Sequence, residues 1–370
     1  MAINSRYRTA PLQSRGILRS APLCFNSPAT QRAERLSGGE TCQSQHTKAD
    51  HGVRVNSLPW RRRARLVGYP TQRISTQAEL LRLALRFFKN TRARRTVPVA
   101  TVRRRLKRIE RFVPRPPAGT LTTVLDGSGV DAVRVAVDEA RSDRCVLYFH
   151  GGAYAIGSAA LLQDFTWRIG AAARAHVLYF DYRLAPEHPF PAALEDALTV
   201  YRWLAQEFDP RRIAFVGDSA GGGLALATLY KLRDEGMPLP AAVVALSPWT
   251  DLALTGPSLK LNAAADPMLN VAILPALANG YLGRADPRNH YASPLYGDAT
   301  GLPPTLIHVG SDEILHDDAV RMAEKLRAAG CEVEIEVWPR MPHAWHLFAR
   351  ILPEGRDAIA RIGTFLQQRL

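Results

Sequence analysis

A short glycine-serine segment constrains the fold of this chain more than any other part of the sequence. The pattern G-x-S-x-G occupies residues 217–221, directly after the apolar run 213–216 and directly before a helix-like stretch at 224–229. This order predicts a sharp turn from a strand into a helix, where glycines permit close backbone approach and the Ser219 hydroxyl points outward. The alternative is an ordinary loop whose serine caps the helix that follows.

Short, nearly continuous apolar runs alternate with longer helical stretches along most of the chain. Such runs are typical of strands buried on both faces of a parallel sheet and joined by helical crossovers. An opening antiparallel pair is expected at 120–125 and 132–137. Parallel strands are expected at 145–149, 177–180, 213–216, 242–246, 305–309 and 333–338. The prediction is therefore an α/β fold with a mostly parallel, eight-stranded sheet flanked by helices.

The N-terminal part of the chain has a different composition. Residues 1–73 mix Ser, Gln, Thr and Arg with few apolar residues, which predicts a basic, disordered extension. An organellar transit peptide and a tail from an over-extended start codon both fit this segment. Two amphipathic helices are expected between residues 76 and 113, the second strongly basic. The basic helix could lie on an anionic membrane or pack over a protein pocket, and we favour the second of these alternatives.

Residues 251–300 interrupt the alternation and predict a helical insertion between two strands. Together with the helices at 74–118, this insertion is expected to cover the carboxyl edge of the sheet, where open α/β folds bind ligands. The predicted organisation is an N-terminal extension at 1–73, cap helices at 74–118 and a catalytic domain at 119–370.

Charge and cysteine usage limit the classes of partner. The net charge is +14, but residues 1–115 hold 26 Lys or Arg and 5 Asp or Glu, against 22 and 29 in residues 116–370. The basic character belongs to one end, so nucleic acid is not expected to bind the catalytic domain. The four cysteines lack metal-site or disulfide spacing. We expect no transmembrane segment and no secretory signal, and hence a cytoplasmic protein.

An outward serine at such a turn suggests a nucleophile, which needs a general base and an acid that orients that base. Asp312 is the predicted acid, because it closely follows the strand at 305–309 and stands at the carboxyl edge of the sheet. Its neighbour Glu313 is expected to point elsewhere, and Asp317 and Asp318 suit the start of a helix. The alternative for Asp312 is a helix N-cap.

The predicted base is His343, in the loop after the last strand, where it can reach Ser219. His346 is expected to belong to the following helix and to pack or cap there.

An oxyanion hole is the third requirement of this chemistry. Its first donor is expected to be the N–H of Ala220, directly after the serine. The loop at 150–154 follows the strand that ends at residue 149 and contains two consecutive glycines. Gly151 and Gly152 are therefore the other predicted donors.

Three motifs in this order resemble the hormone-sensitive lipase family of α/β-hydrolases, especially its bacterial esterases and lactone hydrolases. They are His150-Gly-Gly-Ala-Tyr154, the loop at 181–192 and the segment 217–222. The similarity covers roughly residues 74–370, and Ala153 stands where many members have glycine. The resemblance implies an α/β-hydrolase fold with a helical cap and a structural role for His150. It also implies a triad of Ser219, Asp312 and His343 with an oxyanion hole at Gly151, Gly152 and Ala220.

The expected activity is hydrolysis of small carboxylic esters with short to medium chains, through an acyl-enzyme and without metal or cofactor. A lactone hydrolase or an amide-cleaving relative would use the same triad. Alternatives of other classes are a ligand-binding member without catalysis and a protein acting through its basic segment on nucleic acid or membranes. The sequence leaves the oligomeric state open, with a homodimer among the options.

Overall fold

The computed structural model describes residues 74–92, 98–110, 113, 116–125, 129–157 and 162–370. The prediction of a disordered extension at 1–73 lies outside these residues.

The described residues build one eight-stranded sheet in the order β1-β2-β4-β3-β5-β6-β7-β8. The first two strands pair antiparallel, β2 pairs antiparallel with β4, and all further pairs are parallel. The strands are β1 Leu121–Leu125, β2 Ala132–Ala136, β3 Arg141–Phe149, β4 Ala175–Phe180, β5 Ile213–Asp218, β6 Ala242–Leu246, β7 Thr305–Gly310 and β8 Val333–Trp338. The predicted sheet and its opening antiparallel pair are confirmed.

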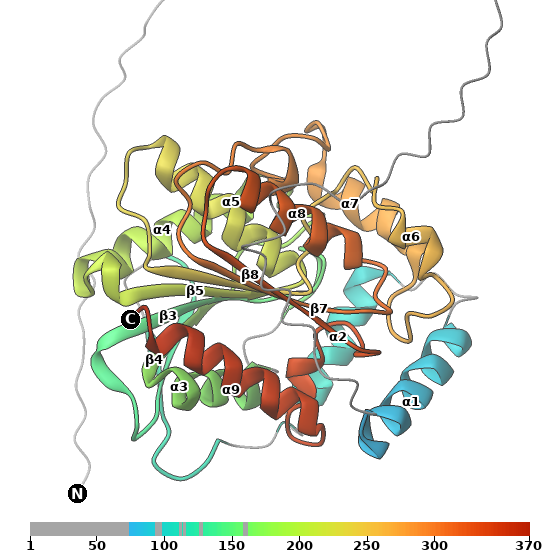
Figure 1. The fold of residues 1–370 in the computed structure, drawn as a ribbon, viewed down its shortest axis with the longest axis horizontal. Coiled ribbons are helices and arrows are strands. Elements are labelled where there is room, and N and C mark those ends of the chain that lie inside the picture. Colours follow the sequence, from blue (N-terminus) through green and yellow to red (C-terminus); the bar gives the residue numbers. More distant parts are fainter. Residues whose placement is uncertain (1–73, 93–97, 111–112, 114–115, 126–128, 158–161) are drawn as a thin grey trace, which may run out of the picture. The chain divides into compact units, whose positions relative to one another are not determined.

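Helices cover both faces of this sheet (Figure 1). Figure 1 shows α3 and α9 on one face and α4, α5 and α8 on the other, and each face has its own buried apolar cluster. The helices are α1 Thr76–Arg92, α2 Val99–Ile109, α3 Gln163–Ala173, α4 Ala192–Glu207, α5 Ala220–Asp234, α6 Ser258–Leu261, α7 Leu274–Leu282, α8 His316–Ala328 and α9 Pro353–Gln367. None of the described helices is long and apolar enough to cross a membrane.

The central strands are apolar because both of their faces are covered. Every residue of β5, β6 and β7 is buried, as expected for a sheet with helices on both sides. In the register of these strands Asp218 lies opposite Leu246, and Leu246 lies opposite His308. Therefore β5 and β6 end at one level, β7 continues two residues further to Gly310, and the turns that follow all three lie at the carboxyl edge of the sheet.

The helix α1 contacts the rest of the chain differently from the way its sequence suggests. Its apolar residues Leu80, Leu83 and Phe87 are 62%, 61% and 65% exposed, whereas Arg82 is buried. The side of α1 that faces the protein combines Ala78 and Leu81, which pack on an apolar cluster, with Arg82, which donates to a carbonyl oxygen and a carboxylate. In α2 no residue is fully buried, and Val102, Arg103 and Leu106 are half-buried.

Candidate active site

Ser219 occupies the turn between β5 and α5 in a conformation that side chains rarely adopt, with φ 55° and ψ −122°. Its N–H donates to the Leu246 carbonyl at 2.8 Å, and its carbonyl accepts from the N–H of Trp249 at 2.9 Å. These bonds from neighbouring segments keep the backbone of Ser219 in a strained conformation that it would not retain without them. The predicted sharp turn from strand to helix is confirmed.

Two glycines of the motif are required by backbone contacts. A Cβ atom at Gly217 would lie 2.4 Å from the carbonyl oxygen of Gly221. A Cβ atom at Gly221 would lie 2.0 Å from the carbonyl oxygen of Phe149, at the end of β3. Any side chain at position 221 would therefore push the start of α5 away from β3, and Ser219 would be displaced together with the helix.

His343 is buried in the segment between β8 and α9, and its Nδ1 lies 2.8 Å from Oε2 of Glu313. A carboxylate can only accept here, so Nδ1 carries the proton and Nε2 keeps its lone pair. The next residue, Ala344, donates its N–H to the Ser247 hydroxyl at 3.1 Å, and Trp249 of the same short segment donates to the Ser219 carbonyl at 2.9 Å. His343 therefore lies near the serine turn with its basic nitrogen free of the carboxylate.

The environment of His343 has opposing effects on its pKa. Burial, the largest effect, lowers it, but the hydrogen bond and charge of Glu313 outweigh burial, and the net pKa is raised. Glu313 is itself fully buried and accepts two further bonds on Oε1, from the Ser247 hydroxyl at 2.7 Å and the Gly310 N–H at 2.6 Å. The carboxylate is thus fixed on both oxygens, and the imidazolium form of His343 is stabilised.

The prediction that Asp312 orients the histidine is contradicted by these contacts. Oδ2 of Asp312 forms an ion pair with Arg82 of α1 at 2.7 Å, and Oδ1 accepts from the Ser311 hydroxyl at 2.9 Å. The cause is the tight turn after β7, in which the Glu313 N–H bonds the Gly310 carbonyl at 3.3 Å. Consecutive side chains in this turn have different partners, and the longer glutamate is the one that reaches the imidazole.

The loop after β3 departs from the prediction at one of its two glycines. The single N–H of Gly151 donates to Oδ1 of Asp218 at 2.9 Å, so this residue offers no donor and its assignment is wrong. Within the described residues, no hydrogen bond engages the backbone N–H of Gly152, Ala153 or Ala220. Gly152 and Ala153 both have positive φ, of 116° and 55°, which belong to a tight turn of the loop.

The expected structural role of His150 is consistent with its contacts. Its ring stacks on Tyr182 with centroids 4.1 Å apart, and its Nδ1 lies 2.8 Å from the Gly151 carbonyl oxygen. Burial lowers the pKa of His150. Asp218 also accepts from the Tyr148 hydroxyl beneath the loop. The loop at 150–154, which carries the candidate donors, is therefore fixed by buried polar groups on its inner side.

The N-terminal helices bind the loops around this site through cationic side chains. From α1, Arg82 donates to the Arg340 carbonyl, and Lys89 donates to the carbonyls of Ala263 and Asp266 at 3.0 and 2.8 Å. From α2, Arg103 donates to two carbonyls and one carboxylate. These acceptors are Ala155 at 2.8 Å, Ala185 at 2.6 Å and Glu187 at 2.9 Å. Both helices therefore contact the loops at the carboxyl edge of the sheet.

His346 was expected to pack rather than react, and its contacts agree with that expectation. It is buried in a short 3-10 helix, η7 Trp345–Phe348, with Nε2 3.0 Å from Nδ1 of His308. His308 Nε2 lies 3.3 Å from Glu336, although not in hydrogen-bonding geometry. Burial lowers the pKa of His308 to about 3 and that of His346 well below its usual value. Both imidazoles are therefore neutral structural groups.

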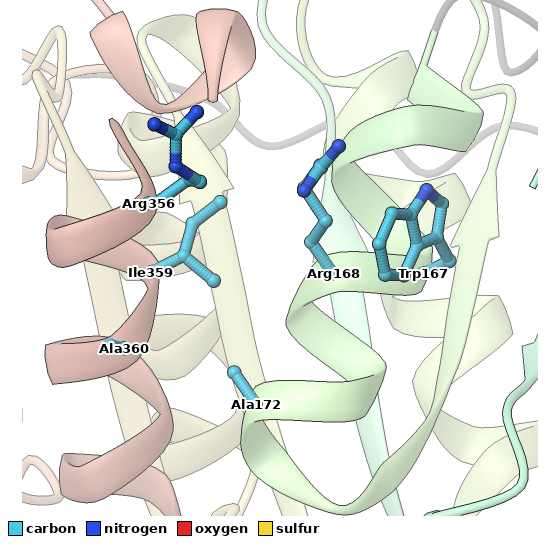
Figure 2. A pocket seen from close by; sticks show the side chains of 6 residues that line it. All are labelled: Trp167, Arg168, Ala172, Arg356, Ile359 and Ala360. Atoms are coloured by element: carbon cyan, nitrogen blue, oxygen red, sulfur yellow. The ribbon is translucent and has the colours of Figure 1, made fainter. Parts of the chain in front are cut away.

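A pocket of about 240 Å³ lies between α3 and α9, away from these residues. Figure 2 shows Arg168 and Arg356 approaching it from opposite helices. Arg168 pairs with Asp164 at 3.0 Å, and Arg356 donates to the Ala349 carbonyl at 3.0 Å. Both cations are thus already engaged, and the pocket contains none of the predicted site residues.

Comparison with known proteins agrees with the fold. A family model described as the α/β-hydrolase fold matches residues 146–347. The chain is 50% identical over 233 residues to an acetyl-hydrolase of Streptomyces hygroscopicus, covering 62% of this chain and 78% of that protein. It is 36% identical over 267 residues to the carboxylesterase/phospholipase LipF of Mycobacterium tuberculosis, covering 68% and 70%.

A solved structure of an esterase from the bacterial hormone-sensitive lipase family is also similar. It is 44% identical with a TM-score of 0.75, and the match covers 80% of this chain and 99% of that one. Fold, motif order and these similarities lead to one conclusion: the chain belongs to the hormone-sensitive lipase family of α/β-hydrolases.

Proposed function

We propose that this protein is a serine carboxylesterase with Ser219 as nucleophile, His343 as general base and Glu313 as the acid that holds the base. The observation that carries the proposal is the buried Glu313–His343 pair beside a serine held at φ 55°. Bacterial relatives named acetyl-hydrolase and carboxylesterase support the reaction class.

In the acylation step, Nε2 of His343 takes the proton of Ser219 as Oγ attacks the ester carbonyl. Glu313 keeps the proton on Nδ1 and stabilises the imidazolium that forms. The proton then passes from Nε2 to the leaving alkoxide, which departs as the alcohol. Water attacks the acyl-enzyme with His343 again as base, and the acid is released together with the regenerated serine.

The oxyanion that forms in both steps needs preorganised donors. We assign this role to the N–H groups of Gly152, Ala153 and Ala220, because none of them is engaged within the described residues. Gly151 has a supporting role instead, because its N–H joins the loop to Asp218.

The cap consists of α1, α2 and the insertion at 251–300. The cationic contacts of α1 and α2 with the surrounding loops support this organisation. In the insertion, Tyr281 of α7 stacks on Tyr154 of the oxyanion loop, with ring centroids 3.6 Å apart and planes at 6°. The cap side chains set the acyl length, which is short to medium.

The test is hydrolysis of p-nitrophenyl esters of increasing acyl length, from acetate upward, by the purified full chain. Activity is expected to be highest for short acyl groups, and Ser219→Ala is expected to remove it. Phenylmethylsulfonyl fluoride should add one sulfonyl group to the wild type, located on Ser219 by mass spectrometry, and none to the variant. Full activity of Ser219→Ala would overturn the proposal. A parallel panel of lactones and amides separates the esterase from its relatives with other substrates.

A further inference from the structure

We infer that Ser247 is a positioning residue of the proposed reaction, which holds Glu313 and the His343 loop in one arrangement through its hydroxyl. This inference rests on the proposed function of the site. Ser247 is fully buried at the carboxyl end of β6, the strand next to the one that carries Ser219.

The hydroxyl of Ser247 joins two segments that are distant in sequence. It donates to Oε1 of Glu313 at 2.7 Å and accepts from the N–H of Ala344 at 3.1 Å. Ala344 directly follows His343, so one oxygen atom contacts the acid and the backbone of the base loop. A hydroxyl has one proton and two lone pairs, and can make both bonds at once.

The segment that begins at Ser247 also contacts the nucleophile. The N–H of Trp249 donates to the Ser219 carbonyl at 2.9 Å, and the N–H of Ser219 donates to Leu246, the residue before Ser247. Residues 246–249 therefore make hydrogen bonds to Ser219, to Glu313 and to Ala344, the residue that follows His343. A displacement of this segment would change their relative positions together.

The backbone of Ser247 lies in the left-handed region, with φ 46°, and its N–H donates to the His308 carbonyl at 2.7 Å. Serine is not the residue that this conformation favours, since glycine adopts it at no steric cost. The chain thus has a serine with a strained backbone at a position where glycine would be unstrained but could not make the two hydroxyl bonds. This combination indicates that the hydroxyl has a task beyond filling space.

The turn after β7, which carries Glu313, supplies a matched control. Ser311 repeats the arrangement one carboxylate earlier, because its hydroxyl donates to Asp312 at 2.9 Å and accepts from the N–H of Arg340 at 2.9 Å. Asp312 pairs with Arg82 and does not hold His343. Loss of the Ser311 hydroxyl therefore removes the same two kinds of bond, one to a carboxylate and one from a backbone N–H, at a carboxylate that does not contact the histidine.

The experiment compares Ser247→Ala with Ser311→Ala in steady-state ester hydrolysis, with wild type and Ser219→Ala as references. Loss of a hydrogen bond to a buried carboxylate is expected to lower kcat of Ser247→Ala about 10- to 100-fold, with KM changed less than about threefold. Ser311→Ala is expected to stay within about threefold of wild type. Ser247→Gly, which suits the positive φ, should lose kcat to the same extent with a smaller loss of thermal stability than Ser247→Ala.

The pH profile separates positioning from simple structural support. Without the Ser247 donor, the Glu313 charge is less satisfied and attracts the His343 proton more strongly, so the acidic limb of kcat/KM should move to higher pH. The other charged or titratable groups acting on His343 are Asp218, Asp266 and His346, and these substitutions leave them unchanged.

Equal kcat for the two serine variants, or a loss in Ser247→Ala and Ser247→Gly with an unmoved pH profile, would overturn the inference. Inactivity of the wild type, or full activity of Ser219→Ala, would instead refute the proposed function.

Discussion

Replacing Glu313 by glutamine tests the reassigned acid with a change of only a few atoms. Oε1 of Glu313 accepts from the Ser247 hydroxyl and the Gly310 N–H. In the variant, only the amide oxygen can accept both bonds, so the amide NH₂ must face Nδ1 of His343. Nδ1 then becomes the acceptor, and the imidazole proton moves to Nε2. The nitrogen that should take the serine proton is thereby already protonated.

The size of the effect follows from this change of tautomer. In serine hydrolases whose triad acid is replaced by its amide, kcat falls about 10⁴-fold, which corresponds to about 5 kcal/mol of transition-state stabilisation. Because the fixed Oε1 side leaves the Glu313→Gln amide no alternative orientation, we expect about a 10³- to 10⁴-fold loss. Activity should not vanish, since the oxyanion donors still act.

The matched control is Asp312→Asn, which alters the neighbouring carboxylate. Asp312 pairs with Arg82 and is partly exposed, so this variant should lower the melting temperature while kcat stays within about threefold of wild type. Initial rates of p-nitrophenyl acetate hydrolysis at several pH values measure both variants. The reasoning would be refuted if Asp312→Asn lost activity as far as Ser219→Ala while Glu313→Gln retained more than about a tenth.

Three further predictions concern stability. Gly221→Ala should unfold or aggregate, with a cost of about 3 kcal/mol or more, because its Cβ would overlap a carbonyl oxygen of β3. Gly280→Ala, which has open space in a helix, should be neutral or stabilising in the same thermal melts. Arg82→Met should cost about 2 kcal/mol, since it leaves Asp312 without its cation, and unchanged proteolysis of α1 would contradict this. The pKa of His308 is lowered to about 3 in the folded protein, so the unfolded state binds its proton first as pH falls below about 6.5. Denaturant titrations should show that the loss of stability from pH 7 to pH 5 is about 2 kcal/mol larger in the wild type than in His308→Asn.

The sheet and the serine turn could be predicted because their signals are local. Apolar runs of strand length and the spacing of Gly217, Ser219 and Gly221 each determine structure within a few residues. His343 was also found from its position after the last strand. Its preference over His346 is supported by the structure, which pairs His343 with a carboxylate and His346 with another buried imidazole.

The acid and one oxyanion donor could not be predicted, because they depend on contacts between distant segments. Proximity to the end of β7 favours Asp312, but the turn geometry and Arg82, 230 residues earlier, determine which carboxylate faces the histidine. Similarly, Gly151 is a suitable donor until the side chain of Asp218 takes its N–H. Sequence spacing places a residue at an edge, and the direction of its side chain depends on neighbours that spacing does not reveal.

The turn at 311–313 assigns two adjacent carboxylates to unrelated partners, one on a covering helix and one on an imidazole. The number of residues in this turn therefore matters as well as their type, because it determines which carboxylate faces which partner. An insertion or deletion between Gly310 and Glu313 would shift both carboxylates along the turn and separate each from its partner in one event. Substitutions at Asp312 are therefore expected to affect the attachment of α1 rather than the orientation of His343.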